Sequence, residues 1–271
     1  KVLEIVSTES IYAALHEDGA ITSWQTEISE EKSNLLNGEV DVIKIAANDH
    51  AFAAIKADGS VVSWGWENGG YDYGGDYSDV ENQLDGYVNV IDIVGTAKSF
   101  AAIRDDGSVI TWGDDLNGAD SSTVTYEING EIDVIEITAS TGAYAALRED
   151  GSVVTWGDNQ YGADSSEVYH ELNGDINVIK IVSNDSSFAA IREDGSVVTW
   201  GKADLYGAGR GGDSSNVSNL LNGDIDVVYI ATGNSYSYSA LREDGSVIKW
   251  GHGDSLRGPD VINLNHFHTV M

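Results

Sequence analysis

The segment between Trp64 and Tyr77 has the composition of a binding loop, with aromatic side chains placed among glycines. Beside Tyr77 itself, it contains Trp66, Tyr71 and Tyr73. Tyrosine and tryptophan bury a large area at low entropic cost and are enriched among the residues that dominate protein interfaces. The composition therefore predicts a partner-binding site. The alternative is a loop that packs its aromatic rings against its own sheet.

A second segment, residues 202–213, carries Tyr206 and Arg210 among glycines and alanines. A guanidinium group can contact a partner's carboxylate through two parallel hydrogen bonds, which gives the contact a defined orientation. We therefore add Tyr206 and Arg210 to the predicted partner-binding residues, with a flexible solvated loop as the alternative. Tyr229 and Tyr236, beside a serine-rich turn, form a third candidate.

The residue spacings give little support for a metal site or a catalytic site. Residues 158–166 and 114–122 offer oxygen ligands of the kind calcium prefers, but neither segment has EF-hand spacing. His266 and His268 are too few for a zinc site, and no HExxH motif is present. The sequence also lacks a nucleophile elbow, a phosphate-binding loop and a dinucleotide fingerprint. We expect no cofactor and no enzymatic activity, with calcium binding as the alternative.

The charge of the chain limits its partners. Its 45 acidic and 14 basic residues give a formal net charge of −31. Such a surface should repel nucleic acids and anionic membranes, which bind through lysine and arginine. Cysteine is absent, which excludes disulfides and thiolate sites. No apolar signal-like or membrane-length segment is present. We expect a protein partner, no membrane insertion, a monomer, and a secreted or cell-surface location.

The elements that must position these loops repeat six times. The glycines of six Asp-Gly pairs lie at positions 19, 59, 107, 151, 195 and 245, and a tryptophan follows each after five residues. Self-similarity at this period indicates small units that bury their apolar faces only against neighbouring units. We therefore expect the six tryptophans, and the aromatic residue that begins each copy, to lie in the core.

One repeat shows how the units should fold. Residues 178–182, 188–192 and 197–200 have strand composition, and the Asp-Gly turn before Ser196 connects the last two strands. Three antiparallel strands in each of six repeats are typical of the blades of a β-propeller. The connector 164–174 resembles a helical turn with a serine cap and a closing glycine, although an irregular outer strand would also fit. We expect an all-β fold in a single domain, 1–271, with repeats at 1–40, 41–88, 89–132, 133–176, 177–225 and 226–271.

The pattern aromatic-Ala-x-x-x-Asp-Gly-x-Val-x-x-Trp-Gly resembles the regulator of chromosome condensation repeat. Residues 100–113, 144–157 and 188–201 show it most clearly. The Ser-Ser-x-Val connector is similar to the bacterial branch of that family, which includes a secreted proteinaceous β-lactamase inhibitor. Family members typically close seven blades. Here six hairpins are present, and Asp260–Leu264 resembles the first strand of a seventh repeat. The alternatives are therefore six blades, seven blades, or a piece of a longer array.

The function that these observations favour is a non-enzymatic protein-binding module of a secreted or surface-exposed bacterial protein, using loops on one face of the propeller. The resemblance implies two alternatives, an enzyme inhibitor of the β-lactamase-inhibitor type and a guanine-nucleotide exchange factor for a small GTPase. A structural spacer domain of an adhesin is a further alternative, since one scaffold serves unrelated tasks.

Overall fold

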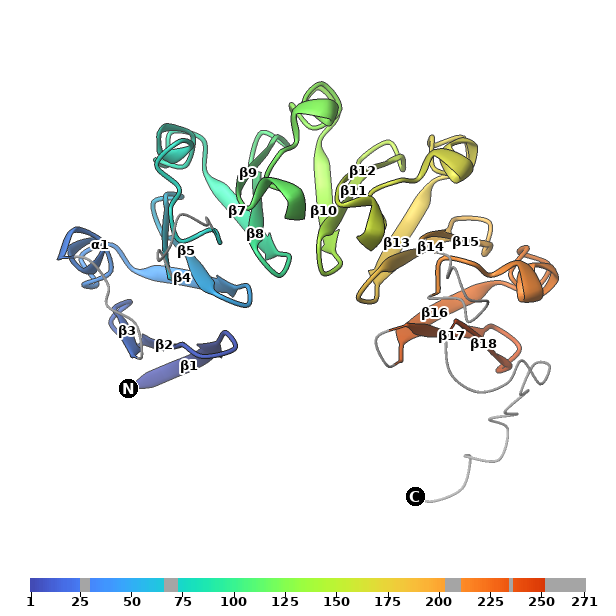
Figure 1. Ribbon diagram of the computed structural model, residues 1–271, viewed down its shortest axis with the longest axis horizontal. Coiled ribbons are helices and arrows are strands. Elements are labelled where there is room, and N and C mark those ends of the chain that lie inside the picture. Colours follow the sequence, from blue (N-terminus) through green and yellow to red (C-terminus); the bar gives the residue numbers. More distant parts are fainter. Residues whose placement is uncertain (25–29, 66–72, 203–210, 234–235, 252–271) are drawn as a thin grey trace, which may run out of the picture. The chain divides into compact units, whose positions relative to one another are not determined.

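A computed structural model describes residues 1–24, 30–65, 73–202, 211–233 and 236–251 (Figure 1). The chain divides into two compact units, Lys1–Gly142 and Ala143–Met271, and each unit is described by itself. Residues 260–264, which resemble the first strand of a seventh repeat, lie outside the described residues.

Strands make up most of the described regular structure. Their bounds are β1 Val2–Ser7, β2 Tyr12–His16, β3 Ile21–Trp24, β4 Val42–Ala47, β5 Ala51–Lys56, β6 Val61–Gly65, β7 Val90–Gly95, β8 Ser99–Arg104, β9 Val109–Gly113, β10 Val134–Ala139, β11 Ala143–Arg148, β12 Val153–Gly157, β13 Val178–Ser183, β14 Ser187–Arg192, β15 Val197–Gly201, β16 Val227–Thr232, β17 Ser237–Arg242 and β18 Val247–Gly251.

These strands form six three-stranded sheets, each from three consecutive strands, which we number 1 to 6 in chain order. The first unit holds sheets 1 to 3 and strand β10, and the second holds β11, β12 and sheets 5 and 6. Each predicted repeat contains one sheet, so the expected all-β architecture of six repeated blades is confirmed.

Sheet 5 shows the register within a repeat. Strands β14 and β15 are antiparallel, with Phe188 opposite Trp200. Strands β13 and β14 are also antiparallel, but their register shifts between Val178 and Lys180, so Ile179 is an extra residue that forms a β-bulge. The first strand is therefore not buried along its whole length, although its sequence is mostly apolar. Val178 and Ile181 are buried, whereas Ile179 is 56% exposed.

The glycine of the Asp-Gly turn also joins one sheet to the next. Gly107 has a φ of 73°, as a tight turn requires, and its carbonyl accepts a hydrogen bond from the N–H of Val134 at 2.9 Å. A Cβ atom on Gly107 would lie 2.5 Å from the Cα of Asp133. Glycine is therefore required both for the turn conformation and for the close approach of the next repeat.

The connectors are short helices, so the helical interpretation is confirmed for the segments that the structure describes. They are α1 Glu30–Leu35 and the 3-10 helices η1 Glu81–Gln83, η2 Asp115–Asn117, η3 Ser122–Val124, η4 Asn159–Tyr161, η5 Ser166–Glu171 and η6 Ser215–Leu220. The predicted serine cap is wrong for η5. Ser165 makes no capping hydrogen bond, because its hydroxyl pairs with that of Thr155, and Asp164 accepts the N–H of Ser166 instead.

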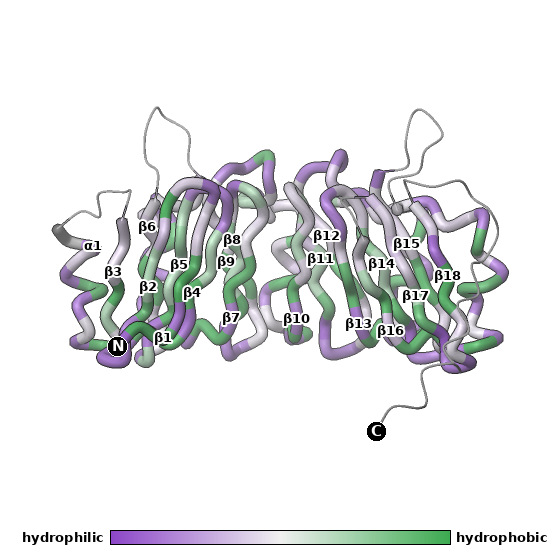
Figure 2. Tube along the Cα trace, turned by 90° about the horizontal axis from the view of Figure 1, so that it is seen from below, coloured by the Kyte–Doolittle hydropathy of each residue, from purple (hydrophilic) through white to green (hydrophobic). Residues whose placement is uncertain are grey.

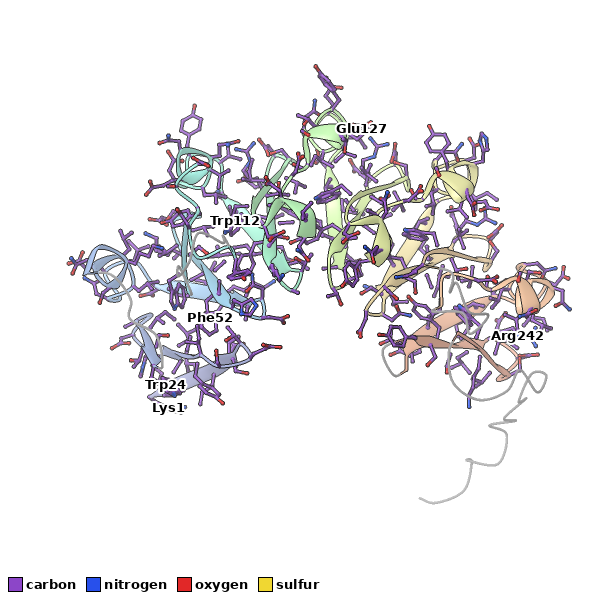
Figure 3. All side chains as sticks on the ribbon, in the orientation of Figure 1. Lys1, Trp24, Phe52, Trp112, Glu127 and Arg242 are labelled. Carbon is purple, nitrogen blue, oxygen red and sulfur yellow. The ribbon has the colours of Figure 1, made fainter. Side chains whose placement is uncertain are left out.

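The core lies between successive sheets. In each sheet the aromatic residue of the second strand packs on the tryptophan of the third, with ring centroids 5.1–5.7 Å apart. Five of these pairs are buried, as expected. The expectation is wrong for Tyr12 and Trp24 of sheet 1, which are 39% and 40% exposed. In Figure 3, Trp24 lies on sheet 1 close to Lys1.

Apolar residues follow the strands and hydrophilic residues follow the turns, as the hydropathy colours of Figure 2 show within each unit. Among the described residues, no helix is long and apolar enough to span a membrane.

Candidate functional site

The structure describes two of the six predicted partner-binding residues, Tyr73 and Tyr77. The other four, Trp66, Tyr71, Tyr206 and Arg210, lie outside the described residues. The candidate site therefore consists of residues around Tyr73 and Tyr77, in the described part of the long connector that follows sheet 2. We call this part the base of the connector.

The side chain of Tyr73 contacts residues from two turns that belong to different sheets. Its ring centroid is 4.5 Å from that of His50, in the turn between β4 and β5, and the two rings are tilted by 42°. The Nζ atom of Lys98, in the turn between β7 and β8, lies 5.5 Å from the same ring centroid. A cation at this distance is attracted by the face of the ring. We call Tyr73, His50 and Lys98 the Tyr73 cluster.

The carboxylate of Asp49 interacts with two members of this cluster, His50 and Lys98. Burial raises the pKa of Asp49, the neighbouring carboxylate of Glu9 raises it further, and the charges of His50 and Lys98 act in the opposite direction. The backbone holds these residues together, since Glu9 N–H donates to Asp49 O and Asp49 N–H donates to Ala97 O. The turns of sheets 1, 2 and 3 thus form one continuous surface with cations, carboxylates and an aromatic ring.

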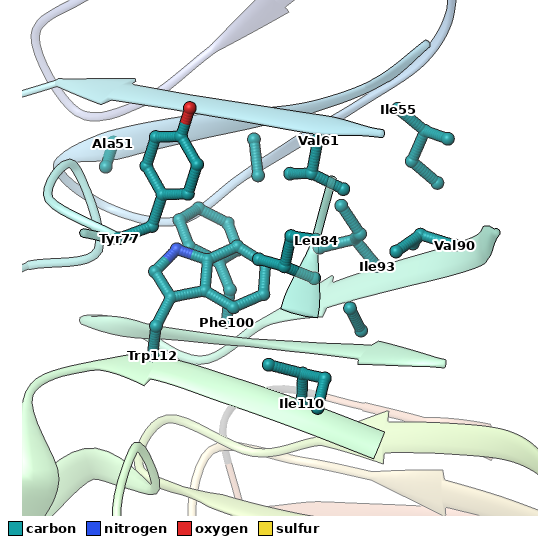
Figure 4. Packing of buried hydrophobic residues seen from close by; sticks show 12 residues of the cluster. Ala51, Ile55, Val61, Tyr77, Leu84, Val90, Ile93, Phe100, Ile110 and Trp112 are labelled. Atoms are coloured by element: carbon teal, nitrogen blue, oxygen red, sulfur yellow. The ribbon is translucent and has the colours of Figure 1, made fainter. Parts of the chain in front are cut away.

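Tyr77 has a different role from Tyr73. Its side chain is only 7% exposed and belongs to the apolar cluster that contains Phe100 and Trp112 (Figure 4). Lys32 fixes the backbone nearby, because its Nζ donates to Gly75 O at 2.7 Å and lies 5.8 Å from the centroid of the Tyr77 ring. Tyr77 therefore packs into the core, as the alternative for this loop predicted, but against residues of the next sheet as well as its own. Binding of a partner by this residue stays a prediction.

Sequence reasoning missed the asparagine that anchors this connector. The side-chain oxygen of Asn48 accepts the N–H groups of His50 and Ala51, and its Nδ2 donates to Tyr73 O. Asn184 accepts the N–H groups of the two equivalent residues in sheet 5, Ser186 and Ser187. Both asparagines are buried.

Each asparagine lies against a glycine of the long connector that follows its sheet. A Cβ on Gly74 would approach Asn48 Nδ2 at 3.3 Å, and a Cβ on Gly211 would approach Asn184 Nδ2 at 2.6 Å. Sheets 3 and 4, whose connectors are shorter, have Thr96 and Ser140 at the same turn position. The choice of asparagine over threonine or serine at this position is the sequence signal that distinguishes the long connectors.

The third sequence candidate lies on a separate groove. Tyr229 is 61% exposed and lines a cavity of about 520 Å³ together with Ile179 and Val228, which are also exposed. Tyr236 is partly buried. This groove belongs to sheets 5 and 6.

Of the loop carboxylates considered as calcium ligands, Asp114 and Asp158 cap short helices, and Asp120 binds the backbone beside η3. Asp114 accepts from Asn117 N–H, Asp158 from Gln160 N–H and Asp120 from Ser122 N–H. Among the residues that the structure describes, no three histidine, cysteine or acidic side chains are grouped so that they could hold a metal ion. Calcium binding stays a prediction.

Comparison with known proteins supports the fold. Residues 134–163 match the model of the regulator of chromosome condensation (RCC1) repeat. No curated protein matches the sequence. The structure of human WBSCR16 is similar at a TM-score of 0.55 and 15% identity, covering 93% of this chain and 76% of that one. Prp20p from Saccharomyces cerevisiae is similar at 0.53 and 17%, covering 93% and 72%.

A third solved structure is the CRINKLY WD40 ectodomain of the Arabidopsis thaliana receptor kinase ACR4. It is similar at a TM-score of 0.50 and 15% identity, covering 95% of this chain and 83% of that one. At such identities the likeness shows the fold alone. The repeat match and the six three-stranded sheets together identify the chain as an RCC1-like β-propeller.

Proposed function

We propose that this chain is a non-enzymatic protein-binding module of a secreted or cell-surface protein, and that its partner contacts the Tyr73 cluster. The observation that carries the proposal is that Tyr73 lies between the His50 ring and the Lys98 ammonium group instead of entering the core. An aromatic ring with a cation beside it is the kind of group that dominates protein interfaces.

The fold is compatible with this task. The Prp20p structure was described together with its binding properties to Gsp1p and histones, and Kap60 has been seen bound to yeast RCC1 (Prp20). These partners belong to those proteins. For this chain the net charge of −31 favours a partner whose contact surface is basic at its edge, because complementary charge accelerates association.

The base of the connector is well suited to present the residues that precede Tyr73 in sequence. Asn48 donates to the Tyr73 carbonyl and Lys32 donates to the Gly75 carbonyl, both at 2.7 Å. Two anchors within three residues fix where this end of the connector leaves the sheets. Fixing a binding segment before association lowers the entropic cost of binding. Trp66 and Tyr71 are therefore included in the proposed surface.

The test is affinity capture from secreted and surface-protein extracts, followed by titration calorimetry with the captured protein. Tyr73→Ala combined with Lys98→Ala should weaken binding about 30-fold or more, since truncation of an interface hot spot costs about 2 kcal/mol. Tyr87→Ala is the matched control, because Tyr87 is 93% exposed in the connector of sheet 2 and lies outside the cluster. Equal affinities for the double variant and the control would contradict the proposal.

A further inference from the structure

Each of the first five sheets receives the next repeat through the same hydrogen bond. The N–H of the valine that opens the next first strand donates to the carbonyl of the turn glycine at 2.9–3.0 Å, in the pairs Val42–Gly19, Val90–Gly59, Val134–Gly107, Val178–Gly151 and Val227–Gly195. We call the face of a sheet that packs against the next first strand its receiving face. Sheets 1 to 5 therefore each have an occupied receiving face.

A second hydrogen bond fixes the end of each connector on the same sheet. The N–H of the first residue of the third strand donates to the carbonyl of a connector leucine or isoleucine at 2.8–3.0 Å, in the pairs Ile21–Leu36, Val61–Leu84, Val109–Ile128, Val153–Leu172 and Val197–Leu221. A glycine follows each of these acceptors after two residues, and the valine of the next first strand follows after six. The end of a connector and the start of the next strand thus dock together.

Sheet 6 has the same groups on its receiving face, without described residues that pair with them. Among the described residues, no N–H donates to Gly245 O and no connector carbonyl accepts the N–H of Val247. No described atom lies within 4 Å of a Cβ built on Gly245, whereas a Cβ on Gly195 would meet Asp226 of the next repeat. Backbone groups that are paired in five sheets are thus open to a further partner on the sixth.

The apolar part of this face is incompletely covered. Ile191 of sheet 5 is 5% exposed and belongs to one apolar cluster with Val227 and Ile230 of the next first strand. Leu241, the equivalent residue of sheet 6, is partly exposed. Ser239 is partly exposed as well, where sheets 1 to 5 have fully buried alanines, namely Ala13, Ala53, Ala101, Ala145 and Ala189. A strand placed on this face would therefore bury further apolar surface.

The sequence after Gly251 contains both parts that dock on the other sheets. A Leu-x-Gly motif occurs at 256–258, as Leu-x-Gly or Ile-x-Gly does at the end of the five connectors between sheets. Residues 260–264, Asp-Val-Ile-Asn-Leu, match residues 41–45, Asp-Val-Ile-Lys-Ile, which begin sheet 2. The interval from leucine to valine is five residues here and six in the other repeats.

The turn inside this segment differs from the other repeats in a consistent way. In the connector of sheet 1, Asn37 Oδ1 accepts the N–H of Glu39, two residues further on, at 2.9 Å. The equivalent positions hold Arg257, which has no side-chain acceptor, and Pro259, which has no N–H. Because both partners of that hydrogen bond are replaced together, neither is left without the other. Proline also presets the φ of a turn.

The stretch before Leu256 is long enough to reach this face. Strand β18 has five residues, Val247–Gly251, and spans about 13 Å, whereas the five residues from Gly251 to Leu256 extend to about 17 Å. The chain can therefore return beside β18 to Val247 without a helix. Lys249 agrees with such a shortened connector. In sheets 2 to 5 its position holds a hydroxyl that donates to a connector carbonyl, on Ser63, Thr111, Thr155 and Thr199.

We propose that the receiving face of sheet 6 is a docking surface and that residues 256–264 of this chain occupy it. Val261 N–H donates to Gly245 O, and Leu256 O accepts the N–H of Val247, as the equivalent groups do on the other five sheets. The docking involves no residue of the Tyr73 cluster, so it is tested independently of the proposed function.

The match of 260–264 with the other first strands also assigns a side to each side chain. Val261 and Leu264 cover Leu241, as Val227 and Ile230 cover Ile191 in the preceding repeat. Ile262 faces solvent at the position of the bulge, where the equivalent isoleucines are 56–62% exposed, namely Ile43, Ile91, Ile135 and Ile179. Neighbouring residues of the segment should therefore respond differently to the same substitution.

Hydrogen exchange of the full chain, resolved to the amides of Val247 and residues 261–264, tests the docking. These amides should exchange at least about tenfold more slowly than in an unstructured peptide. Val261→Asp places a charge on the buried side of the strand and should abolish this protection at both places. Ile262→Asp, the matched control, places the same charge on the solvent side and should leave the protection unchanged. Equal exchange in the two variants, or unprotected amides in the unsubstituted chain, would overturn the proposal.

Two further measurements separate this occupant from others. The protection should not change over about a hundredfold range of protein concentration, since the contact lies within one chain. Protection that rises with concentration would assign the face to a second copy and overturn the proposal. In Gly245→Ala, the added Cβ would meet Asp260, and a single strand leaves this face at lower cost than a whole sheet. This variant should therefore release residues 261–264 to fast exchange while β14 stays protected, and slow exchange there would contradict the contact.

Discussion

The side-chain amide of Asn48 donates a hydrogen bond to the backbone carbonyl of Tyr73 at 2.7 Å, which joins the turn of sheet 2 to the end of its long connector. The same side chain closes the turn by accepting the N–H of Ala51 at 2.7 Å. One buried residue therefore sets both the turn and the position of the Tyr73 cluster.

Asn48→Asp should separate these two functions. The carboxylate still accepts the turn N–H groups but cannot donate to the Tyr73 carbonyl, and it meets that oxygen as a negative charge. We expect a loss of about 1–3 kcal/mol in the free energy of unfolding, measured by chemical denaturation, because a buried hydrogen bond is lost. Hydrogen exchange should also accelerate at residues 73–75.

Asn129→Asp is the control for this prediction. Asn129 is exposed, and its side-chain oxygen accepts the N–H of Glu131 at 2.9 Å, a role that aspartate keeps. The control should change stability by no more than about 0.5 kcal/mol, as is usual for surface substitutions. Equal losses in the two variants would show that the Asn48–Tyr73 hydrogen bond is not what holds the connector.

The repeats and strands were predictable because their signals are local. The Asp-Gly pair before Ser196 marks a hairpin wherever strand-forming residues flank it, and Gly195 has the expected positive φ of 75°. Tyr77 could not be assigned to the core in this way. Its burial depends on Phe100 and Trp112, which belong to the next sheet. It also depends on the length of the connector, which brings Tyr77 to these residues only when the two sheets are packed together.

The candidate site was predictable in composition but not in geometry. The aromatic residues of segment 64–77 indicated where to search, yet His50 and Lys98 approach Tyr73 from turns of two different sheets. The bulge at Ile43 was hidden for a different reason: Val42, Ile43 and Ile45 are all apolar, and only the register of β4 with β5 inside the sheet leaves Ile43 exposed. Contacts across sheets are not contained in any one repeat.

Gly107→Ala and Gly245→Ala should separate turn strain from crowding. Both glycines have positive φ, 73° and 82°, and a Cβ on Gly107 would be crowded by the Cα and side-chain atoms of Asp133. Among the residues that the structure describes, no atom lies within 4 Å of a Cβ built on Gly245. We expect a loss of about 1–2 kcal/mol in unfolding free energy for Gly245→Ala from strain alone, and about 3 kcal/mol or more for Gly107→Ala. Equal losses would contradict a role for glycine in sheet-to-sheet packing.

Trp112→Phe and Trp200→Phe form a second matched pair. Both variants remove the same atoms from a buried ring, but only the Trp112 indole N–H has acceptors among the described residues, Gly74 O at 3.1 Å and Ser63 Oγ at 3.4 Å. The hydroxyl of Ser63 also donates to that carbonyl, so Gly74 keeps a partner. Trp112→Phe should therefore cost about 1 kcal/mol more than Trp200→Phe in denaturant titrations. A larger loss for Trp200→Phe would mean that its indole N–H has an acceptor.

Asp49→Asn should stabilise the protein at neutral pH. The pKa of Asp49 is raised in the folded state, chiefly by burial and then by Glu9, so its ionised form opposes folding above that pKa. The gain should be about 0.5 kcal/mol or less at pH 7, since the group is mostly solvated. It should fade as the pH falls towards the unfolded value of about 3.9, where both states bind the proton. Denaturation at pH 7 and pH 4 measures the difference.

Glu9→Gln should also stabilise the protein at pH 7, and the double variant should gain less than the sum of the two single variants, because the repulsion between Glu9 and Asp49 is removed only once. A destabilised Asp49→Asn at pH 7 would show that the carboxylate is held by favourable contacts with His50 and Lys98.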